Sequence, residues 1–153
     1  MKNIIIEEYN HITIGRFYVA HSSKGIFKIG IGTTKQAFLK LIPENKKIIL
    51  KTKKRGKEIP QNKLDLSNGT EFQKKIWLQI KKIPKGETRS YAWLAKQIHH
   101  PKAIRAAANA CGANPVPLLI PCHRVICSDG TIGGFSGPLK LKKFLLKLEG
   151  VNF

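Results

Sequence analysis

Runs of strand-forming residues separated by turn residues characterise the first part of the chain. Residues 14–21 and 26–31 are rich in branched and aromatic side chains, and the Ser-Ser-Lys-Gly segment between them favours a turn. This pattern predicts a β-hairpin. Thr33 and Thr34 are suited to cap a short helix, which Pro43 would end.

A charged segment divides the chain. An apolar run at residues 48–50 leads into residues 51–57, most of which are basic. Such a run is typical of a solvated loop or linker more often than of a specific binding tail. We therefore expect an N-terminal domain over residues 1–60 and a C-terminal domain over residues 61–153.

Apolar residues recur at helical spacing in the second half. Thr70 and Gln73 form the pattern of a capping box, which marks the start of a helix. Ser90 suits the N-cap of a second short helix, and Pro101 suits the first turn of a third helix over residues 102–111. The tight connection between these two helices indicates a helix-turn-helix. The first helix carries its apolar face at Phe72, Ile76, Trp77, Ile80 and Ile83.

A glycine-rich segment precedes a last amphipathic helix. Residues 128–130 and 133–134 bracket Thr131 and Ile132, which favours a tight loop or a winged hairpin. The helix that follows ends at Glu149. Together the elements predict an α+β protein, with a small antiparallel sheet and a helix in the N-terminal domain. The C-terminal domain is expected to be a winged-helix-like helix-turn-helix.

The net charge of +19, from 28 basic and 9 acidic residues, favours a polyanionic partner such as nucleic acid. The alternative is a lysine-rich surface that serves only solvation. The excess is spread over both halves, so charge alone does not locate a binding face. No run of about 20 apolar residues would cross a bilayer, and Glu7 and Glu8 interrupt any signal peptide. We expect a cytoplasmic protein without membrane association.

Three cysteines are present, at 111, 122 and 127, without a CxxC pair. Their spacing to the histidines matches no zinc finger, so we expect no metal. An odd number without a secretion signal indicates reduced thiols.

Cys122 lies beside His123 and Arg124, between apolar flanks. Nearby positive charge lowers a thiol pKa and favours the thiolate, so we interpret Cys122 as a nucleophile, although an inert buried thiol is the alternative. Neighbouring side chains diverge, so His123 would act through one water. Glu149 and Asp129 are both candidates to orient its imidazole, and spacing does not choose between them.

The predicted third helix has a surface made largely of alanine, with Arg105 as its long cationic side chain. A buried bundle helix explains the alanines without any function. Alternatively, small side chains would let the helix approach a nucleic-acid groove while Arg105 projects into it.

The segment Asn114-Pro-Val-Pro-Leu-Leu-Ile-Pro-Cys-His-Arg-Val125 resembles the active-site signature of O6-alkylguanine-DNA alkyltransferases. The similarity continues upstream at residues 84–91 and 101–106, and downstream at 133–137 and 145–150. It covers residues 69–150 in order. Such proteins transfer an alkyl group from O6 of guanine to their own cysteine, once per molecule, with no cofactor.

The resemblance implies three groups of site residues. The catalytic residues would be Cys122, His123, Glu149 and Asn114. The substrate-binding residues would be Tyr91, Val125, Phe135, Ser136 and Lys142. The DNA-binding residues would be Ala103, Ile104, Arg105, Ala106 and Ser128, acting on double-stranded DNA that contains O6-alkylguanine through minor-groove binding and base flipping. The protein would act as a monomer.

Three other functions stay open at this point. A DNA-binding regulator would explain the charge and the helices but leaves Cys122 unused. A protein that only binds alkylated bases would not need the thiol, and a cysteine hydrolase gains nothing from the basic surface. One departure from the family is Phe135, where some members have tyrosine.

Overall fold

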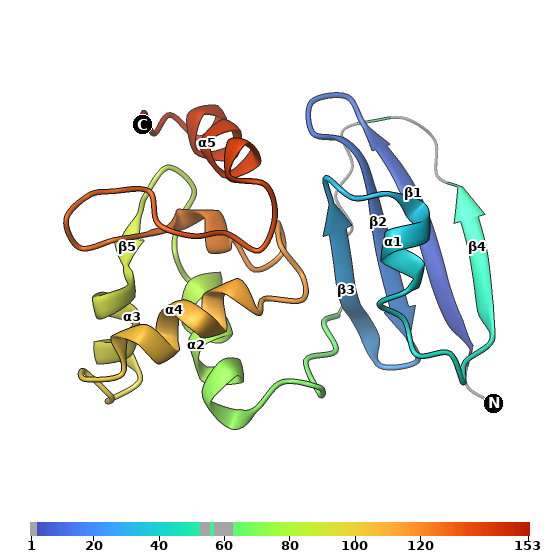
Figure 1. The fold of residues 1–153 in the computed structure, drawn as a ribbon, viewed down its shortest axis with the longest axis horizontal. Coiled ribbons are helices and arrows are strands. Elements are labelled where there is room, and N and C mark those ends of the chain that lie inside the picture. The colour runs from blue at the N-terminus through green and yellow to red at the C-terminus, as the bar shows by residue number, and fades with distance from the viewer. Residues whose placement is uncertain (1–2, 53–55, 57–62) are drawn as a thin grey trace. The chain divides into compact units, whose positions relative to one another are not determined.

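The computed structural model describes residues 3–52, 56 and 63–153. The chain divides into two compact units, Met1–Ser67 and Asn68–Phe153, and each is described by itself (Figure 1). The predicted domain boundary at residue 60 lies outside the described residues, as does most of the charged segment before it.

The first unit contains a four-stranded sheet in the order β3-β2-β1-β4. The predicted hairpin is confirmed as β2 (Gly15–Ser22) and β3 (Gly25–Ile31), which pair antiparallel. β1 (Ile4–His11) pairs antiparallel with β2, while β4 (Ile48–Thr52) pairs parallel with β1. The sheet is therefore mixed rather than wholly antiparallel. The reason is the helical crossover after β3, which returns the chain to the end of the sheet at which β1 starts.

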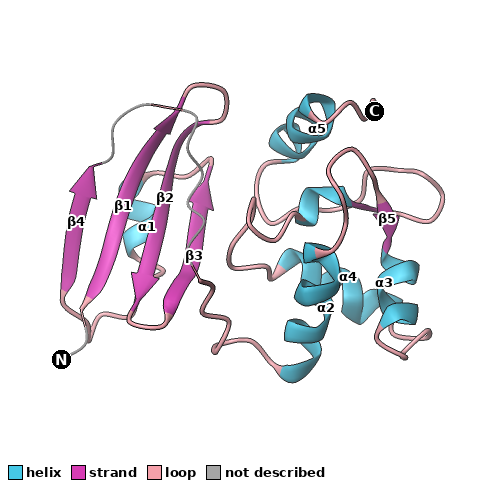
Figure 2. Cartoon of the chain, turned by 180° about the vertical axis from the view of Figure 1, so that it is seen from behind, coloured by secondary structure: helices cyan, strands magenta, loops and turns pink. Residues whose placement is uncertain are grey.

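That crossover contains α1 (Lys35–Leu39), which covers one face of the sheet (Figure 2). Thr34 caps it as predicted, because its hydroxyl accepts from the Ala37 N–H at 3.1 Å. The helix buries Phe38 completely, which stabilises the unit by about 2–3 kcal/mol. Gly30 is required beneath it, since a Cβ there would lie 2.4 Å from the Phe38 ring. The core around Phe38 comprises Ile4, Ile6, Tyr18, Ala20 and Ile42.

The second unit begins with α2 (Glu71–Lys81), where Thr70 and Gln73 form the predicted capping box. α3 (Tyr91–Gln97) starts at its predicted cap, Ser90. α4 (Ile104–Gly112) begins two residues later than expected, and Pro101 lies in the turn before it. The Trp77 indole on α2 donates to the Ala110 carbonyl on α4 at 2.8 Å, so α2 braces the α3–α4 pair.

The remaining elements carry the chain past the predicted nucleophile. A 3₁₀ turn, η1 (Cys122–Arg124), leads into β6 (Val125–Ile126), and α5 (Leu139–Leu148) follows a loop. β6 pairs parallel with β5 (Arg89–Ser90). Of the two predicted alternatives for residues 128–134, the tight loop is formed: the Cys127 N–H bonds to the Thr131 carbonyl at 2.9 Å, and β6 pairs with β5 rather than in a hairpin. No helix in the described part of the chain is long and apolar enough to span a membrane.

Candidate active site

Cys122 opens η1 and is 4% exposed. Its Sγ lies 3.8 Å from the Ser136 hydroxyl, so the loop after β6 reaches the thiol. Burial raises the pKa of the Cys122 thiol, while hydrogen bonds from Asn114 and Ser136 and the nearby Lys142 ammonium oppose that rise. The thiol is therefore shielded from solvent but surrounded by groups that favour its anion.

Asn114 fixes the backbone that leads to the nucleophile. Its buried amide donates to the Ile120 carbonyl at 2.7 Å and accepts from the Val116 N–H at 3.0 Å. The loop it closes contains Leu118 in the left-handed region, at φ 74°. A residue other than glycine in this region needs support from its surroundings, and the Asn114 amide supplies that support.

His123 is the second residue of η1 and is buried. Its Nε2 lies 2.9 Å from Glu149 Oε1. Its Nδ1 is buried and has no hydrogen-bond partner among the described residues. Burial lowers the pKa of His123, although the Glu149 carboxylate acts in the opposite direction.

The structure distinguishes the two acids that were candidates to orient the His123 imidazole. Glu149 contacts His123, whereas Asp129 lies in an exposed turn and accepts from the Thr131 N–H and hydroxyl at 2.9 and 2.7 Å.

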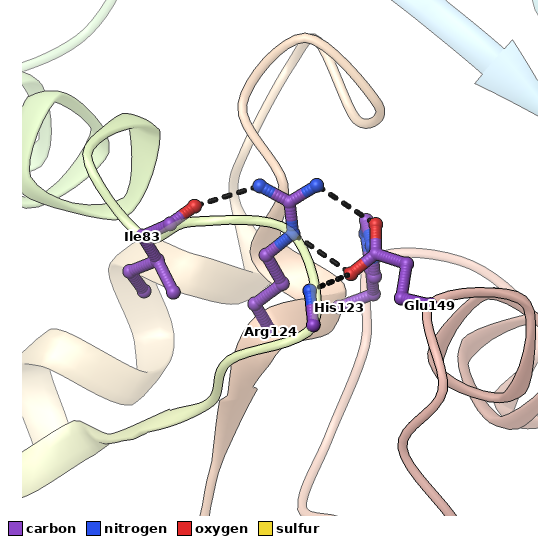
Figure 3. A network of polar contacts seen from close by, with 5 residues as sticks. Ile83, His123, Arg124 and Glu149 are labelled. Carbon is purple, nitrogen blue, oxygen red and sulfur yellow. Dashed lines mark hydrogen bonds and ion pairs between the residues drawn. The ribbon is translucent and has the colours of Figure 1, made fainter.

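Arg124 was not among the predicted site residues, yet its guanidinium makes three hydrogen bonds in the site (Figure 3). Its Nε and Nη2 donate to the two oxygens of Glu149 at 2.9 and 2.8 Å, and its Nη1 donates to the Ile83 carbonyl at 2.7 Å. Burial alone would raise the pKa of Glu149, but the bonds from Arg124 and His123 lower it to about 2. The guanidinium thus joins η1, the end of α5 and the segment after α2.

Glu149 occupies the C-cap of α5, where the helix dipole disfavours a carboxylate. Gly150 follows at φ 85°, and the Val151 N–H bonds back to the Leu146 carbonyl at 2.9 Å. This backbone arrangement ends the helix at a fixed point and orients Glu149 toward η1. The contacts with Arg124 and His123 offset the unfavourable position.

Tyr91 and Lys142 converge on the loop after β6. The Tyr91 hydroxyl lies 3.4 Å from the Gly134 carbonyl, and burial raises its pKa to about 12, so the phenol stays protonated. Lys142 has no exposed surface, and burial lowers its pKa to about 8. Its Nζ donates to three carbonyls, those of Val125, Ile132 and Gly134, at 2.6, 2.6 and 2.8 Å. All three donors of the ammonium are used, so Lys142 shapes the loop rather than offering a bond to a ligand.

The loop has a close approach at Gly133. A Cβ there would lie 2.8 Å from the Tyr91 hydroxyl oxygen, and the residue sits at φ 71°. Both facts require glycine. Of the other predicted substrate residues, Val125 is buried, Phe135 is half-buried and Ser136 is exposed.

The predicted DNA-binding residues of α4 lie on its open side. Arg105 and Ala106 are exposed, and Ile104 is 44% exposed. Ala107 and Ala110 are buried against the bundle. Packing in the bundle therefore accounts for Ala107 and Ala110 but not for the exposed Ala106. Ser128 is exposed in a separate turn.

The three cysteines are unpaired. Burial raises the pKa of Cys111 to about 12, which makes its thiol unreactive. Across the described ranges, no cluster of three or more His, Cys, Asp or Glu side chains is arranged to hold a metal ion.

The chain is similar to known proteins in sequence and in fold. Residues 71–151 match the family model described as 6-O-methylguanine DNA methyltransferase, DNA binding domain. The methylated-DNA–protein-cysteine methyltransferase of Methanosarcina acetivorans is 52% identical over 82 residues, which are 54% of this chain and 53% of that protein. A probable methylated-DNA–protein-cysteine methyltransferase of Acanthamoeba polyphaga mimivirus is 51% identical over 90 residues, 58% of this chain and 60% of that protein. The matched segment thus spans little more than half the length of these curated relatives.

The likeness in structure extends further than the likeness in sequence. The crystal structure of Mycobacterium tuberculosis OGT in complex with DNA superposes with a TM-score of 0.76 at 28% identity, covering 95% of this chain and 92% of that one. The superposition includes the first unit, which the family model does not reach. Since the family model alone matches more than half of the residues, the chain belongs to the 6-O-methylguanine DNA methyltransferase family.

Proposed function

We propose that this protein repairs DNA by transferring the alkyl group of O6-alkylguanine irreversibly to Cys122. The observation that carries the proposal is the buried thiol followed by a histidine whose Nε2 is bound to a carboxylate. The similar Mycobacterium tuberculosis protein was crystallised with DNA, and the Methanosarcina relative is named for cysteine methylation.

The site supports a direct displacement at the alkyl carbon. His123 accepts the thiol proton through a bridging water, and Cys122 attacks the carbon as a thiolate. The bond from that carbon to O6 breaks, a thioether forms, and guanine leaves with the electron pair. The Tyr91 phenol donates a hydrogen bond that stabilises the charge on the departing base, and the proton that His123 took from the thiol passes to the base through water. Asn114 holds the nucleophile in place, and Ser136 and Phe135 line the loop beside the base.

DNA binding is assigned to the exposed side of α4. The segment Ala103–Ala106 would enter the minor groove, with Ser128 as a further contact. Small side chains permit close approach, and Arg105 would fill the space of the extruded nucleotide. The net charge of +19 supplies attraction to the phosphates.

The remaining assignments follow from the same residues. Unpaired cysteines suit a reducing compartment, so we place the protein in the cytoplasm. We assign it as a monomer without a cofactor, because the thiol, the histidine and the carboxylate all come from one chain.

Intact mass after incubation with an O6-methylguanine duplex tests the function. We expect a gain of one methyl per molecule, mapped by peptide sequencing to Cys122, because the Cys111 thiol is held protonated. Cys122→Ala should lose transfer and keep DNA binding, while Cys127→Ala, the matched control, should react normally.

Three results would contradict the proposal. A methyl on Cys111 or Cys127 at a comparable rate would remove Cys122 from its role. An unchanged mass would leave a DNA-binding regulator or a damage-recognition protein, and turnover of an ester substrate would indicate a hydrolase.

A further inference from the structure

The Glu149 carboxylate is surrounded by donors. Arg124 donates to both of its oxygens, at 2.9 and 2.8 Å, and His123 Nε2 lies 2.9 Å from Oε1 (Figure 3). The Gly86 N–H approaches Oε2 at 3.5 Å. The side chains of Glu149 and Arg124 are only 11% and 16% exposed. Two parallel N–H···O bonds from a guanidinium give the carboxylate a fixed orientation as well as a counter-charge.

This environment determines which His123 nitrogen carries the proton. A carboxylate held ionised by a guanidinium has only acceptor sites, so the nitrogen that meets it has to be a donor. His123 Nε2 is that nitrogen. In a neutral imidazole the other nitrogen then carries the lone pair, and His123 Nδ1 is the buried atom without a partner among the described residues.

We infer that Arg124 is a positioning residue that fixes His123 as the neutral Nε2–H tautomer and leaves Nδ1 as the base for Cys122. The inference rests on the proposed function for its role in alkyl transfer. The tautomer itself follows from the contacts of Glu149 alone.

Arg124 has a second effect, through its charge. The ionisable groups around His123 are Glu149 and Lys142, both contributed by α5 and its C-cap, and Arg124 and Cys122 from η1 itself. Glu149 raises the pKa of His123, whereas burial, then Arg124 and Lys142, lower it. Without Arg124, Glu149 would pair with His123 alone and favour the imidazolium, which is not a base.

The bond to Ile83 explains why the residue is arginine. Arg124 meets both carboxylate oxygens and the Ile83 carbonyl at 2.7 Å, from three different nitrogens. A lysine ammonium is a compact charge that does not match this planar fork.

Nitrogen-15 NMR of the His123 ring in the wild-type protein tests the tautomer without any substrate. We expect Nε2 to be protonated and Nδ1 unprotonated at pH 7, with the signals identified by their loss in His123→Gln. A protonated Nδ1 or an imidazolium at pH 7 would overturn the inference. The proposed function is judged separately, by methyl transfer in the wild type.

The role of Arg124 is tested by the pH dependence of the reaction with free O6-benzylguanine. In Arg124→Gln we expect the acid limb of the profile to move up by about half a pH unit or more, which lowers the rate on that limb by about threefold or more. The direction follows because removal of a positive charge raises the pKa of His123. Arg16→Gln is the matched control, since Arg16 pairs with Glu8 at 3.4 Å in the first unit, and its profile should equal that of the wild type.

Circular dichroism separates these effects from loss of folding. If Arg124→Gln unfolds at 25 °C, Arg124→Lys takes its place, and we expect a smaller shift in the same direction. A slower reaction with an unmoved acid limb in a folded variant would make Arg124 a purely structural residue and end the inference.

Discussion

At the scale of single residues, the site contains charged side chains that are buried and whose hydrogen-bonding groups have protein partners. Lys142 is the clearest case, because its ammonium has no exposed surface and meets three backbone carbonyls. Those carbonyls belong to β6 and to the loop that faces Cys122. The Lys142 side chain therefore joins α5 to the loop beside the Cys122 thiol.

Lys142→Met should destabilise the protein and slow the reaction. The variant keeps the bulk of the side chain but removes a donor from three carbonyls, of which that of Gly134 keeps the Tyr91 hydroxyl at 3.4 Å. We expect a cost of about 2–4 kcal/mol. Urea unfolding measures the stability. The rate of reaction with O6-benzylguanine shows whether the loop after β6 still supports the reaction at Cys122. The exposed neighbour Lys143, changed to Met, should leave both unaltered. Equal stability of the two variants would show that water replaces the ammonium.

At the scale of elements, the turn between α3 and α4 contains a conformational strain. His99 follows the C-cap of α3 at φ 63°, and the N–H groups of His99 and His100 bond back to Lys96 and Ala95 at 3.0 and 2.9 Å. This is the helix end at which glycine is preferred, because its backbone adopts a positive φ without a clash.

His99→Gly should stabilise the protein by about 0.5–1 kcal/mol, since the left-handed conformation no longer strains a Cβ. Thermal unfolding monitored by circular dichroism measures the change. His100→Gly is the control, because its φ is not positive, and it should give no gain. A loss of stability in His99→Gly would mean that the imidazole contributes contacts that outweigh the strain.

Elements with local signals could be predicted from the sequence. The caps Thr34, Thr70 and Ser90 act on N–H groups three residues away, so their patterns marked three helix starts correctly. β1 was not predicted, because Glu7 and Glu8 interrupt its apolar alternation. The parallel pairs β1–β4 and β5–β6 join distant segments, and no local pattern specifies such a register.

In the candidate site, too, local sequence features could be predicted and contacts between distant residues could not. The motif around Cys122 predicted a nucleophile and a neighbouring histidine from local sequence alone. Glu149 and Asp129 were equivalent in sequence, and only the packing of α5 against η1 distinguishes them. Arg124 stood within the motif, but its partners Ile83 and Glu149 lie 41 and 25 positions away, so its role had no sequence signal.

At the scale of the whole molecule, the proposed function requires that recognition of a duplex and reaction at Cys122 be separable. The thiol is buried, whereas Arg105 is exposed on α4. A free base needs no extrusion from a duplex, so its reaction rate depends on the thiol site alone. The reaction rate with duplex DNA depends on extrusion of the base as well.

Arg105→Ala should therefore slow repair of duplex DNA by about tenfold or more while leaving the reaction with O6-benzylguanine unchanged. Rapid-quench rates with both substrates measure the ratio. Lys102→Ala removes a charge from the turn before α4 and should weaken DNA binding only slightly, by about one phosphate contact in the salt dependence. Equal losses of Arg105→Ala on both substrates would assign Arg105 to the pocket instead.

The pairing of β5 with β6 has a mechanical consequence. Ser90, the cap of α3, lies in register with Ile126, four residues after the nucleophile. Backbone pairing thereby ties the start of α3 to the segment that carries the thiol, so the two cannot separate without breaking this pairing. In the proposed reaction the duplex has to supply the movement, and its local flexibility then governs how readily a damaged base arrives.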